Sequence, residues 1–204
     1  YGFKGEFLGV YPGGGGFNFK SNLQKPEERQ IILIKGFQGR SGRVIPVLKA
    51  IQHLNEELKA FHIIVFGADK TMKDFINKVN LKIWANFQIH EKIKHNKVLE
   101  LMQNAKLYIG NSNSDGMPNT LLEAICFGAF PIQSNPGDAS TEIIEDDVNG
   151  LLINDCEDVD HIRSLIKHAL TNKILVNKAF DINKKLRKSL DFDVIKNQVL
   201  DKYQ

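Results

Sequence analysis

YIGNSNSDGMPNTLLEAICFG, residues 108–128, joins an apolar run, a polar loop and an amphipathic run in that order. The apolar run begins at Ala105 with AKLYI, and its length and composition predict a short buried strand. Pro118 suits the first turn of a helix, and Gly128 suits the position just after its end. The stretch therefore predicts a strand, a glycine-bearing loop and a helix.

Two carboxylates stand eight positions apart in this stretch. Asp115 lies at the mouth of the loop, and Glu123 lies about one and a half turns into the predicted helix. Free backbone amides at a helix start, together with the helix dipole, attract a phosphate or a polarised sugar hydroxyl. An ionised Glu123 only accepts hydrogen bonds, and the paired hydroxyls of a ribose are natural donors to it. The combination fits a nucleotide sugar, whereas a turn-capping Asp115 and a solvent-exposed Glu123 are the alternative without a ligand.

From Gln30 onwards, short apolar runs alternate with longer amphipathic runs. This alternation is typical of parallel strands whose two faces are covered by helices. The expected strands span 31–34, 62–66, 85–89, 106–109, 130–133 and 151–153. The expected helices span 43–59, 71–80, 96–104, 118–127 and 139–145. The sequence thus predicts an α/β fold, a three-layer α/β/α Rossmann-like doubly wound parallel sheet of about six strands, with its ligand at the carboxyl ends of the strands, where Asp115 lies.

The segments on either side of residues 29–154, the predicted nucleotide-sugar-binding domain, have a different character. Residues 1–28 contain Pro12 followed by Gly13–Gly16 and show no helical period, which is typical of a lead-in segment or an interdomain hinge. A glycine run can cradle phosphate, but this one lacks the helix that should follow it directly. Residues 155–204 have a helical pattern and are expected to pack on the domain as a C-terminal extension.

The composition fits a globular protein with one substantial core. The chain has 204 residues, 42% of them hydrophobic, and a formal net charge of +3. That mild charge does not require nucleic acid as a partner, and no apolar run approaches the roughly 18–20 residues of a membrane span. Cys126 and Cys156 show no zinc spacing and are expected to be reduced, which makes a cytoplasmic setting the default. Because the chain opens with Tyr1, we expect it to be a piece of a longer protein.

A second candidate anion site follows the first predicted strand. The sequence KGFQGRSGR, residues 35–43, places Lys35, Arg40 and Arg43 among glycines just before a helix. The glycines follow the spacing GxxGxxG rather than the GxGxxG of dinucleotide enzymes. A dehydrogenase requires an acidic residue at the end of the second strand, and the second predicted strand has none there, although Asp69 lies a little beyond it. Hydride transfer is therefore disfavoured.

The order acid, Gly, any residue, Pro, Asn, followed by LLEA, resembles the signature of retaining glycosyltransferases of the GT-B fold, family 4, or glycosyl transferases group 1. The later segment PIQSNPGDASTEIIEDDVNGLLI, residues 131–153, is similar to the family's segment after the signature helix. GT-B enzymes have two Rossmann-like domains, so the resemblance implies that this chain is the C-terminal, donor-binding half and that the N-terminal acceptor domain lies outside it. It also implies that Asp115, which replaces the commoner Glu, contacts the donor sugar and that Glu123 holds the nucleotide ribose.

The resemblance assigns further residues to the donor site. Family members place an Arg and a Lys of the basic loop against the donor diphosphate. We favour Arg43 and Arg40 over Lys35 for this role, although their spacing differs from the usual one. The nucleotide base is expected near Ile93, between the third strand and the next helix. The other expected contacts come from the loop and first turn of the signature helix, at Gly116, Met117, Pro118, Asn119 and Thr120.

Together these residues predict the donor half of a metal-independent retaining hexosyltransferase. The whole enzyme is expected to move a sugar from a UDP-sugar or GDP-sugar to a hydroxyl of an acceptor glycan or lipid-linked glycan, in bacterial-type polysaccharide or glycoconjugate synthesis. No cofactor and no metal are expected, because arginines can replace a cation and the acidic pairs at 158–160 and 191–193 suit helix starts. The isolated chain should transfer little or no sugar. The enzyme is expected in the cytoplasm, with peripheral association at the inner face of the membrane as a further option.

Two other classes of protein stay open at this point. One is a nucleotide-sugar epimerase or a phosphorylase on a similar two-domain scaffold, although a phosphorylase needs a cofactor lysine for which the sequence offers no candidate. The other is a non-catalytic nucleotide-binding module, to which the fold alone offers no objection.

Overall fold

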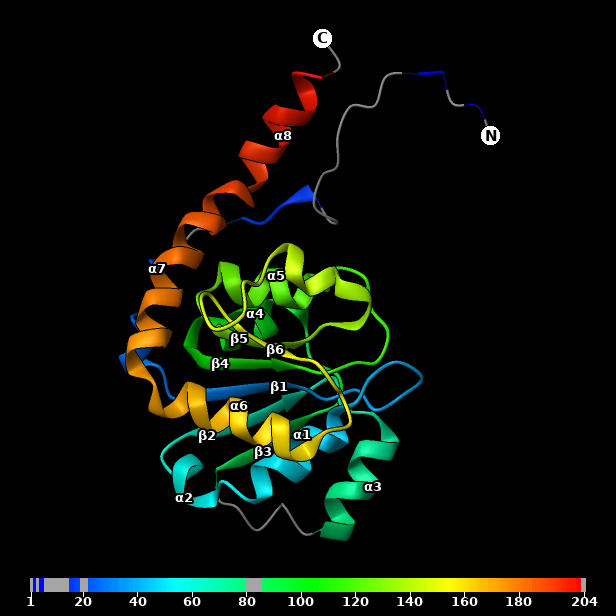
Figure 1. Cartoon of the computed structure of the whole chain (residues 1–204), viewed down its shortest axis with the longest axis vertical. Helices are drawn as coiled ribbons and strands as arrows, with labels where there is room; N and C mark the ends of the chain where they lie inside the picture. The colour runs from blue at the N-terminus through cyan, green and yellow to red at the C-terminus, as the bar shows by residue number, and fades with distance from the viewer. Residues whose placement is uncertain (1, 3, 6–14, 19–21, 80–85, 203–204) are drawn as a thin grey trace.

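Six parallel strands form one sheet at the centre of the described residues (Figure 1). The computed structural model describes residues 2, 4–5, 15–18, 22–79 and 86–202. The strands are β1 (Ile31–Lys35), β2 (His62–Phe66), β3 (Phe87–His90), β4 (Ala105–Gly110), β5 (Phe130–Ser134) and β6 (Leu151–Ile153). Their order across the sheet is β3-β2-β1-β4-β5-β6, and every neighbouring pair is parallel, so the predicted doubly wound α/β fold is confirmed.

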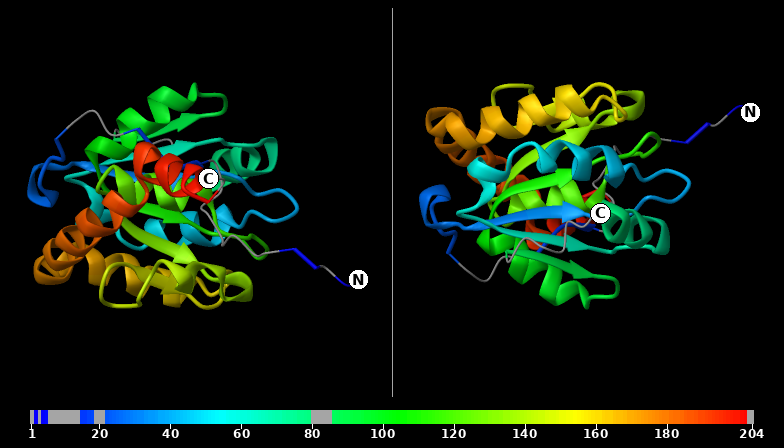
Figure 2. Two further views of the ribbon diagram at one scale, coloured as in Figure 1. Left: turned by 90° about the horizontal axis from the view of Figure 1, so that it is seen from above. Right: turned by 90° about the horizontal axis from the view of Figure 1, so that it is seen from below.

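Helices cover both faces of the sheet, which gives three layers (Figure 2). One face carries α1 (Val44–Gln52), α2 (Asn55–Leu58), α3 (Lys70–Val79) and α6 (Val159–Thr171), and the other carries α4 (His95–Asn104) and α5 (Asn119–Cys126). Successive side chains of a strand point to opposite faces. Ile32 and Ile34 of β1 are buried with the first set of helices, while Leu33 is buried with the second. Both faces of β1 therefore belong to the core, which explains the continuous apolar run of this strand.

The C-terminal part of the chain is helical, as expected. α7 (Lys173–Ser189) packs against α5, α6 and β5, and α8 (Phe192–Leu200) follows it. Ile162 and Ile166 of α6 and Leu175 of α7 are buried in the same core cluster as the strands. A domain boundary near residue 154 stays a prediction, and these helices share their core with the sheet. Within the described ranges, no helix has the length and apolar character needed to cross a membrane.

The lead-in segment contacts the junction of α7 and α8. The Phe17 N–H donates to the Leu190 carbonyl at 2.9 Å, and the Phe192 N–H donates to the Phe17 carbonyl at 3.0 Å. This contact holds the segment beside the two C-terminal helices (Figure 1). Gly13 and Gly14 lie outside the described residues, so the interpretation of the glycine run as a linker stays a prediction.

Two predicted elements have different bounds in the structure. The helix expected over 43–59 is divided into α1 and α2, because the chain makes a tight turn at His53 and Leu54. The N–H groups of these two residues donate to carbonyls only three positions back, and Leu54 is buried. The third strand, expected over 85–89, runs instead over Phe87–His90, and residue 85 lies outside the described residues.

The segment expected to be helical over 139–145 is helical only over 139–142, where it forms a 3-10 helix rather than an α-helix. The segment is a 3-10 helix, η4 (Pro136–Glu142), with a kink inside it. Gly137 and Asp138 have φ values of 65° and 60°, which an α-helix does not allow. The Ser140 hydroxyl donates to the Ser134 carbonyl at 2.9 Å and so keeps the segment close to the end of β5.

The topological switch point of the sheet lies between β1 and β4. The chain leaves β1 towards α1 on one face and leaves β4 towards α5 on the other. Ligands of doubly wound sheets bind outside the carboxyl ends of the strands at such a point. The Arg43 N–H donates to the Asn111 carbonyl, and the Asn113 N–H donates to the Ser41 carbonyl, each at 2.9 Å. These two hydrogen bonds fasten the loop after β1 to the loop after β4.

The end of α5 is a Schellman motif. Gly128 has a φ of +82°, and its N–H donates to the Ile125 carbonyl at 3.1 Å. The Ala129 N–H donates to the Ala124 carbonyl at 2.9 Å, which completes the motif. The predicted helix stop at Gly128 is confirmed.

Arg29 is buried where α4 and α5 end. The residue is 2% exposed, and its Nη1 donates to the carbonyls of Met102, Ala105 and Phe127 at 3.3, 3.1 and 3.0 Å. Carbonyls at helix C-termini carry negative partial charge, which suits a cation. Burial lowers the pKa of Arg29 to about 10, so the group stays charged at neutral pH. One guanidinium thus joins the C-terminal ends of two helices.

Candidate functional site

A small pocket lies at the carboxyl ends of β1, β4 and β5. Lys35, the last residue of β1, and Asp115, in the loop after β4, approach each other there, with 3.8 Å between Nζ and Oδ2. The side chains are 35% and 33% exposed, so a ligand can reach both of them. The pocket is also lined by Phe37, Ser41, Gly42, Asn111, Ser112 and Gln133. The predicted sugar-binding acid and one of the three predicted cations therefore lie together at the switch point.

Glu123 is a buried carboxylate of α5. Its side chain is 8% exposed, and its Oε1 lies 2.6 Å from Nε2 of His95, the first residue of α4, whose side chain is 65% exposed. The alternative in which Glu123 lies on a solvated helix face is contradicted by this burial. A buried carboxylate without a partner is strongly unfavourable, so the contact with His95 stabilises Glu123 in place. The pair also connects the two helices that cover this face of the sheet.

Tyr108 of β4 lies beneath the start of α5. The residue is 0% exposed, and its hydroxyl donates to Thr120 Oγ1 at 2.9 Å. Burial raises the pKa of Tyr108, and the negative charges of Glu123 and Asp115 raise it further, so the phenol stays protonated. The hydrogen bond fixes the position of Thr120, one of the predicted donor contacts.

The loop that leads into α5 contains the other predicted contacts. Gly116 and Asn119 are exposed, and Met117 is partly buried against two core clusters. Pro118 is buried and takes the N-cap position of α5. Ile93 lies between β3 and α4 and packs, partly buried, against the core cluster beneath α4 and α5. The exposed members of this set surround the N-terminus of a helix, which favours an anion or a sugar hydroxyl.

The two predicted arginines lie on the loop after β1. Arg43 Nε is 2.7 Å from Glu157 Oε1, and Arg43 Nη1 donates to the Gly42 carbonyl at 2.8 Å. Arg40 is exposed on the same loop. Among the ion pairs of the described residues, Asp115 is paired with Lys35 rather than with either arginine. The geometry therefore favours Lys35 as the cation of the site, whereas the sequence favours Arg43 and Arg40.

Acidic residues that suggested other chemistry have structural partners. Asp69 accepts from the N–H of Met72 in the first turn of α3 at 2.9 Å and from the N–H of Gln38 at 2.8 Å. Asp158 and Asp191 are the N-caps of α6 and α8, which confirms their interpretation as helix starts. Across the part of the chain that the structure describes, no three His, Cys, Asp or Glu residues gather in a geometry suited to a metal ion.

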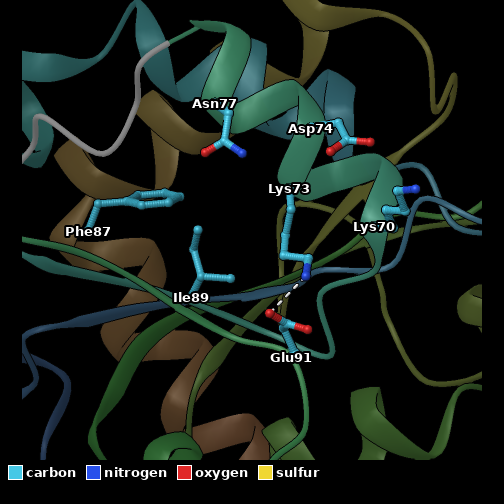
Figure 3. Close-up of a pocket in the computed structure, with 7 residues that line it drawn as sticks. All are labelled: Lys70, Lys73, Asp74, Asn77, Phe87, Ile89 and Glu91. Atoms are coloured by element: carbon cyan, nitrogen blue, oxygen red, sulfur yellow. Dashed lines mark ion pairs between the residues drawn. The ribbon is translucent and has the colours of Figure 1, made fainter.

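A larger cavity, of about 800 Å³, lies elsewhere, between α3 and β3 (Figure 3). Lys73 and Glu91 face each other across it and form an ion pair of 2.8 Å. Its other lining residues are Lys70, Asp74, Asn77, Phe87 and Ile89. β3 is the outer strand of the sheet, two strands away from β1, so this cavity is separate from the pocket of Lys35 and Asp115.

A sequence model of the glycosyl transferases group 1 family matches residues 17–189. The chain belongs to this family. The resemblance carried by the stretch around Asp115 and Glu123 is therefore confirmed at the level of the family.

A curated relative of this glycosyl transferases group 1 chain comes from Campylobacter jejuni subsp. jejuni serotype O:2. It is GalNAc-alpha-(1->4)-GalNAc-alpha-(1->3)-diNAcBac-PP-undecaprenol alpha-1,4-N-acetyl-D-galactosaminyltransferase, and it is 24% identical over 157 residues. The match covers 75% of this chain and 43% of the relative. The chain thus spans less than half the length of that protein.

Solved glycosyltransferase structures share the fold. S. aureus TarM, in complex with fondaparinux, alpha-GlcNAc-glycerol and UDP, has a TM-score of 0.71 at 15% identity, covering 93% of this chain and 39% of its own. The pneumococcal O-GlcNAc transferase GtfA, in complex with UDP and GlcNAc, has a TM-score of 0.71 at 15% identity, covering 92% and 38%. Anabaena HepE, in complex with UDP and glucose, has a TM-score of 0.68 at 14% identity, covering 86% and 48%. At these identities the similarity establishes the fold alone.

Two polar residues of this region were not singled out from the sequence. His95 lies 28 positions from Glu123, so no local sequence pattern indicates their contact. Gln133 did carry a signal, because it is an amide within the otherwise apolar run FPIQ. Central parallel strands are usually apolar throughout, and a polar residue there suggests a specific partner.

Proposed function

We propose that this chain is the donor-binding domain of a retaining, metal-independent glycosyltransferase of family 4. The whole enzyme moves a sugar from a nucleotide diphosphate sugar to an acceptor hydroxyl. The observation that carries the proposal is the placement of Asp115 with Lys35 at the switch point of the sheet, beside a helix that holds the buried Glu123. Membership of the glycosyl transferases group 1 family supports the same reaction class.

Each carboxylate has a separate role in this proposal. Asp115 accepts hydrogen bonds from hydroxyls of the donor sugar, and the loop that begins at Gly116 supports them with backbone amides. Glu123 accepts from the ribose hydroxyls, which join or replace its contact with His95. Ile93 contacts the nucleotide base. Asp115 is exposed enough for sugar hydroxyls to reach it from solvent. Glu123 is buried, and a hydrogen bond from a ribose hydroxyl to a carboxylate is stronger where water is excluded.

The departing nucleoside diphosphate needs positive charge. A helix N-terminus contributes only about 0.3–1 kcal/mol towards a nearby anion, whereas one preorganised donor to a developing oxyanion is typically worth about 3–4 kcal/mol. Lys35, Arg40 and Arg43 are the candidates. Lys35 is already inside the pocket, while Arg43 has to exchange Glu157 for the phosphate. Two such cations replace a divalent metal in this proposal.

The rest of the enzyme supplies the acceptor site. The chain spans 43% of its Campylobacter relative, whose name describes an undecaprenol-linked glycan acceptor. We therefore propose an acceptor glycan or lipid-linked glycan held by a second domain, in polysaccharide or glycoconjugate synthesis at the cytoplasmic face of a membrane. In this proposal residues 29–154 form the nucleotide-sugar-binding domain, residues 155–204 form its helical extension, and the chain alone binds donor but transfers little sugar.

Calorimetry with UDP, GDP and ADP tests the donor site. UDP is the first choice, because structural neighbours are complexes with UDP. Replacing Glu123 by Gln keeps the shape of the side chain and removes its charge. Hydrogen bonds to a charged group contribute about 1.5–3 kcal/mol, so we expect the Kd of the preferred nucleotide to rise about 10- to 150-fold.

The control is Glu56→Gln on α2. Glu56 is exposed, is paired with the neighbouring Lys59 at 2.6 Å, and lies on the opposite face of the sheet, so nucleotide affinity should not change. Equal binding by the Glu123→Gln variant and the unchanged chain would remove Glu123 from the ribose site. Indifference to all three nucleotides would favour a non-catalytic module without a nucleotide ligand. EDTA should leave binding unchanged, and a strict requirement for manganese would contradict the metal-independent reaction.

A further inference from the structure

Two amide side chains of the pocket at the switch point have buried oxygens without a donor. Gln133 is 2% exposed and Asn111 is 5% exposed. Within the part of the chain that the structure describes, no donor reaches Gln133 Oε1 or Asn111 Oδ1. Buried polar atoms are nearly always hydrogen-bonded, so each exception calls for a partner from outside the fold. Both residues line the same pocket as Lys35 and Asp115.

Neighbouring carbonyl groups favour one orientation of each amide. Asn111 Nδ2 donates to the carbonyls of Arg43 and Cys156 at 2.7 and 2.8 Å. Gln133 Nε2 lies 3.4 Å from both the carbonyl and the hydroxyl of Ser134. A carbonyl oxygen only accepts hydrogen bonds, so turning the Asn111 amide round would set its oxygen against two carbonyl oxygens, and turning the Gln133 amide round would set its oxygen against one. The two amide oxygens are therefore acceptors in need of a donor.

The position of Gln133 also restricts how it can move. A Cβ atom built on Gly110 would lie 2.2 Å from Gln133 Oε1 and 2.7 Å from the Tyr108 hydroxyl. The amide of Gln133 thus lies directly over the glycine that ends β4, and Tyr108 is already committed to Thr120. The space that a side chain at position 110 would occupy is taken by the Gln133 amide. This close packing holds its oxygen in a defined place within the site.

The chemistry of the pocket selects its ligand. Besides the cation Lys35, the pocket offers acceptor oxygens of Asp115, Asn111 and Gln133, and a phosphate, which has only acceptor oxygens at neutral pH, gains nothing from these oxygens. A neutral hydroxyl does gain, because it donates one hydrogen bond. The pocket holds about 20 Å³ of space for a small molecule, and one water molecule needs roughly 10–15 Å³ of such space. This space fits one hydroxyl group or one water molecule.

We propose that Gln133 is a specificity-determining residue for the donor: its amide oxygen accepts a hydrogen bond from one hydroxyl of the transferred sugar, beside the contact of Asp115. The inference rests on the proposed function and adds to it a residue that selects the sugar rather than the nucleotide. A sugar that carries a bulky or non-donating substituent at that carbon is rejected. Binding of the nucleotide without its sugar does not involve Gln133.

The test compares the unchanged chain with Gln133→Met, which keeps the length of the side chain and removes its amide. Calorimetry is run with UDP, UDP-glucose, UDP-galactose and the monodeoxyfluoro analogues of whichever sugar binds better. Gln88→Met is the matched control, because Gln88 is exposed on the outer strand β3. Leaving a buried acceptor unpaired typically weakens binding about tenfold or more.

We expect Gln133→Met to leave the Kd of UDP within about twofold and to raise the Kd of the better UDP-sugar about tenfold. One deoxyfluoro analogue should bind the unchanged chain about tenfold more weakly than its parent sugar, and this difference should vanish in Gln133→Met. The analogue series on the unchanged chain gives its answer even if the variant does not fold.

Three results would overturn the inference. The first is that UDP-sugars bind the unchanged chain no more tightly than UDP does. The second is that a UDP-sugar has the same Kd for the unchanged chain and for Gln133→Met. Either result would show that Gln133 does not contact the sugar. Loss of UDP affinity in Gln133→Met would place the diphosphate, not the sugar, in the pocket. In these cases UDP still binds, so the proposed function stands. Absence of binding by UDP and by every UDP-sugar would count against the proposed function itself.

Discussion

Gly128→Ala tests whether Arg29 is held rigidly at the end of α5. The φ of Gly128 is +82°, and a Cβ there would lie 2.5 Å from Arg29 Nη2 and 3.1 Å from Phe180 Cε2. A left-handed conformation costs an L-residue about 1–2 kcal/mol, and forcing extra atoms into a packed site costs about 1–3 kcal/mol more. The smaller freedom of the unfolded alanine chain offsets about 0.4–1 kcal/mol of this. We expect Gly128→Ala to lower the free energy of unfolding by about 2–4 kcal/mol.

Gly67→Ala supplies the matched comparison. Gly67 has a similar φ of +69°, but no heavy atom lies within 4 Å of a Cβ built on it. This variant therefore meets only the backbone strain and should lose about 1 kcal/mol. Urea unfolding followed by circular dichroism measures both values. Equal losses in the two variants would refute the reasoning, because they would mean that Arg29 and Phe180 move aside without cost.

Two further predictions concern the cations and the cysteines. Lys35→Met should weaken UDP binding in calorimetry more than Arg43→Met does, because Lys35 is 35% exposed and only 3.8 Å from Asp115, while Arg43 is paired with Glu157 at 2.7 Å. A larger loss in Arg43→Met would restore the order suggested by the sequence. Burial raises the pKa of the Cys126 thiol to about 12, so at pH 8 a disulfide reagent should label the more accessible Cys156 and reach Cys126 only after unfolding. Rapid labelling of both thiols in the folded chain would contradict the burial of α5.

The sequence was informative wherever neighbouring residues decide the structure. The apolar run of β1 predicts a buried parallel strand because both of its faces meet helices, and Gly128 predicts the end of α5 because few residues accept its φ. The helix expected over 139–145 is a 3-10 helix over 139–142 instead, directly after a left-handed turn at Gly137 and Asp138. Periodicity alone does not detect such a turn.

The residues of the candidate site also differ in whether neighbouring residues in the sequence decide their positions. Asp115 could be placed at the carboxyl edge of the sheet, and Glu123 in the helix that follows, from the order of strand, loop and helix. The contact of Glu123 with His95 could not, since it depends on how α4 packs beside α5. The choice among Lys35 and the two arginines depends on the fold of one loop and on Glu157, which is more than 100 positions away in the chain.

Arg29 has a practical consequence for any mutational search for phosphate-binding arginines. Its guanidinium touches the carbonyls that close α4 and α5, the same helices that carry His95 and Glu123. Truncating Arg29 would remove the hydrogen bonds that join the ends of the two helices, and we expect nucleotide affinity to fall although Arg29 does not line the pocket of Lys35 and Asp115. Such a screen would score Arg29 as a false positive unless each affinity is normalised to the fraction of correctly folded molecules.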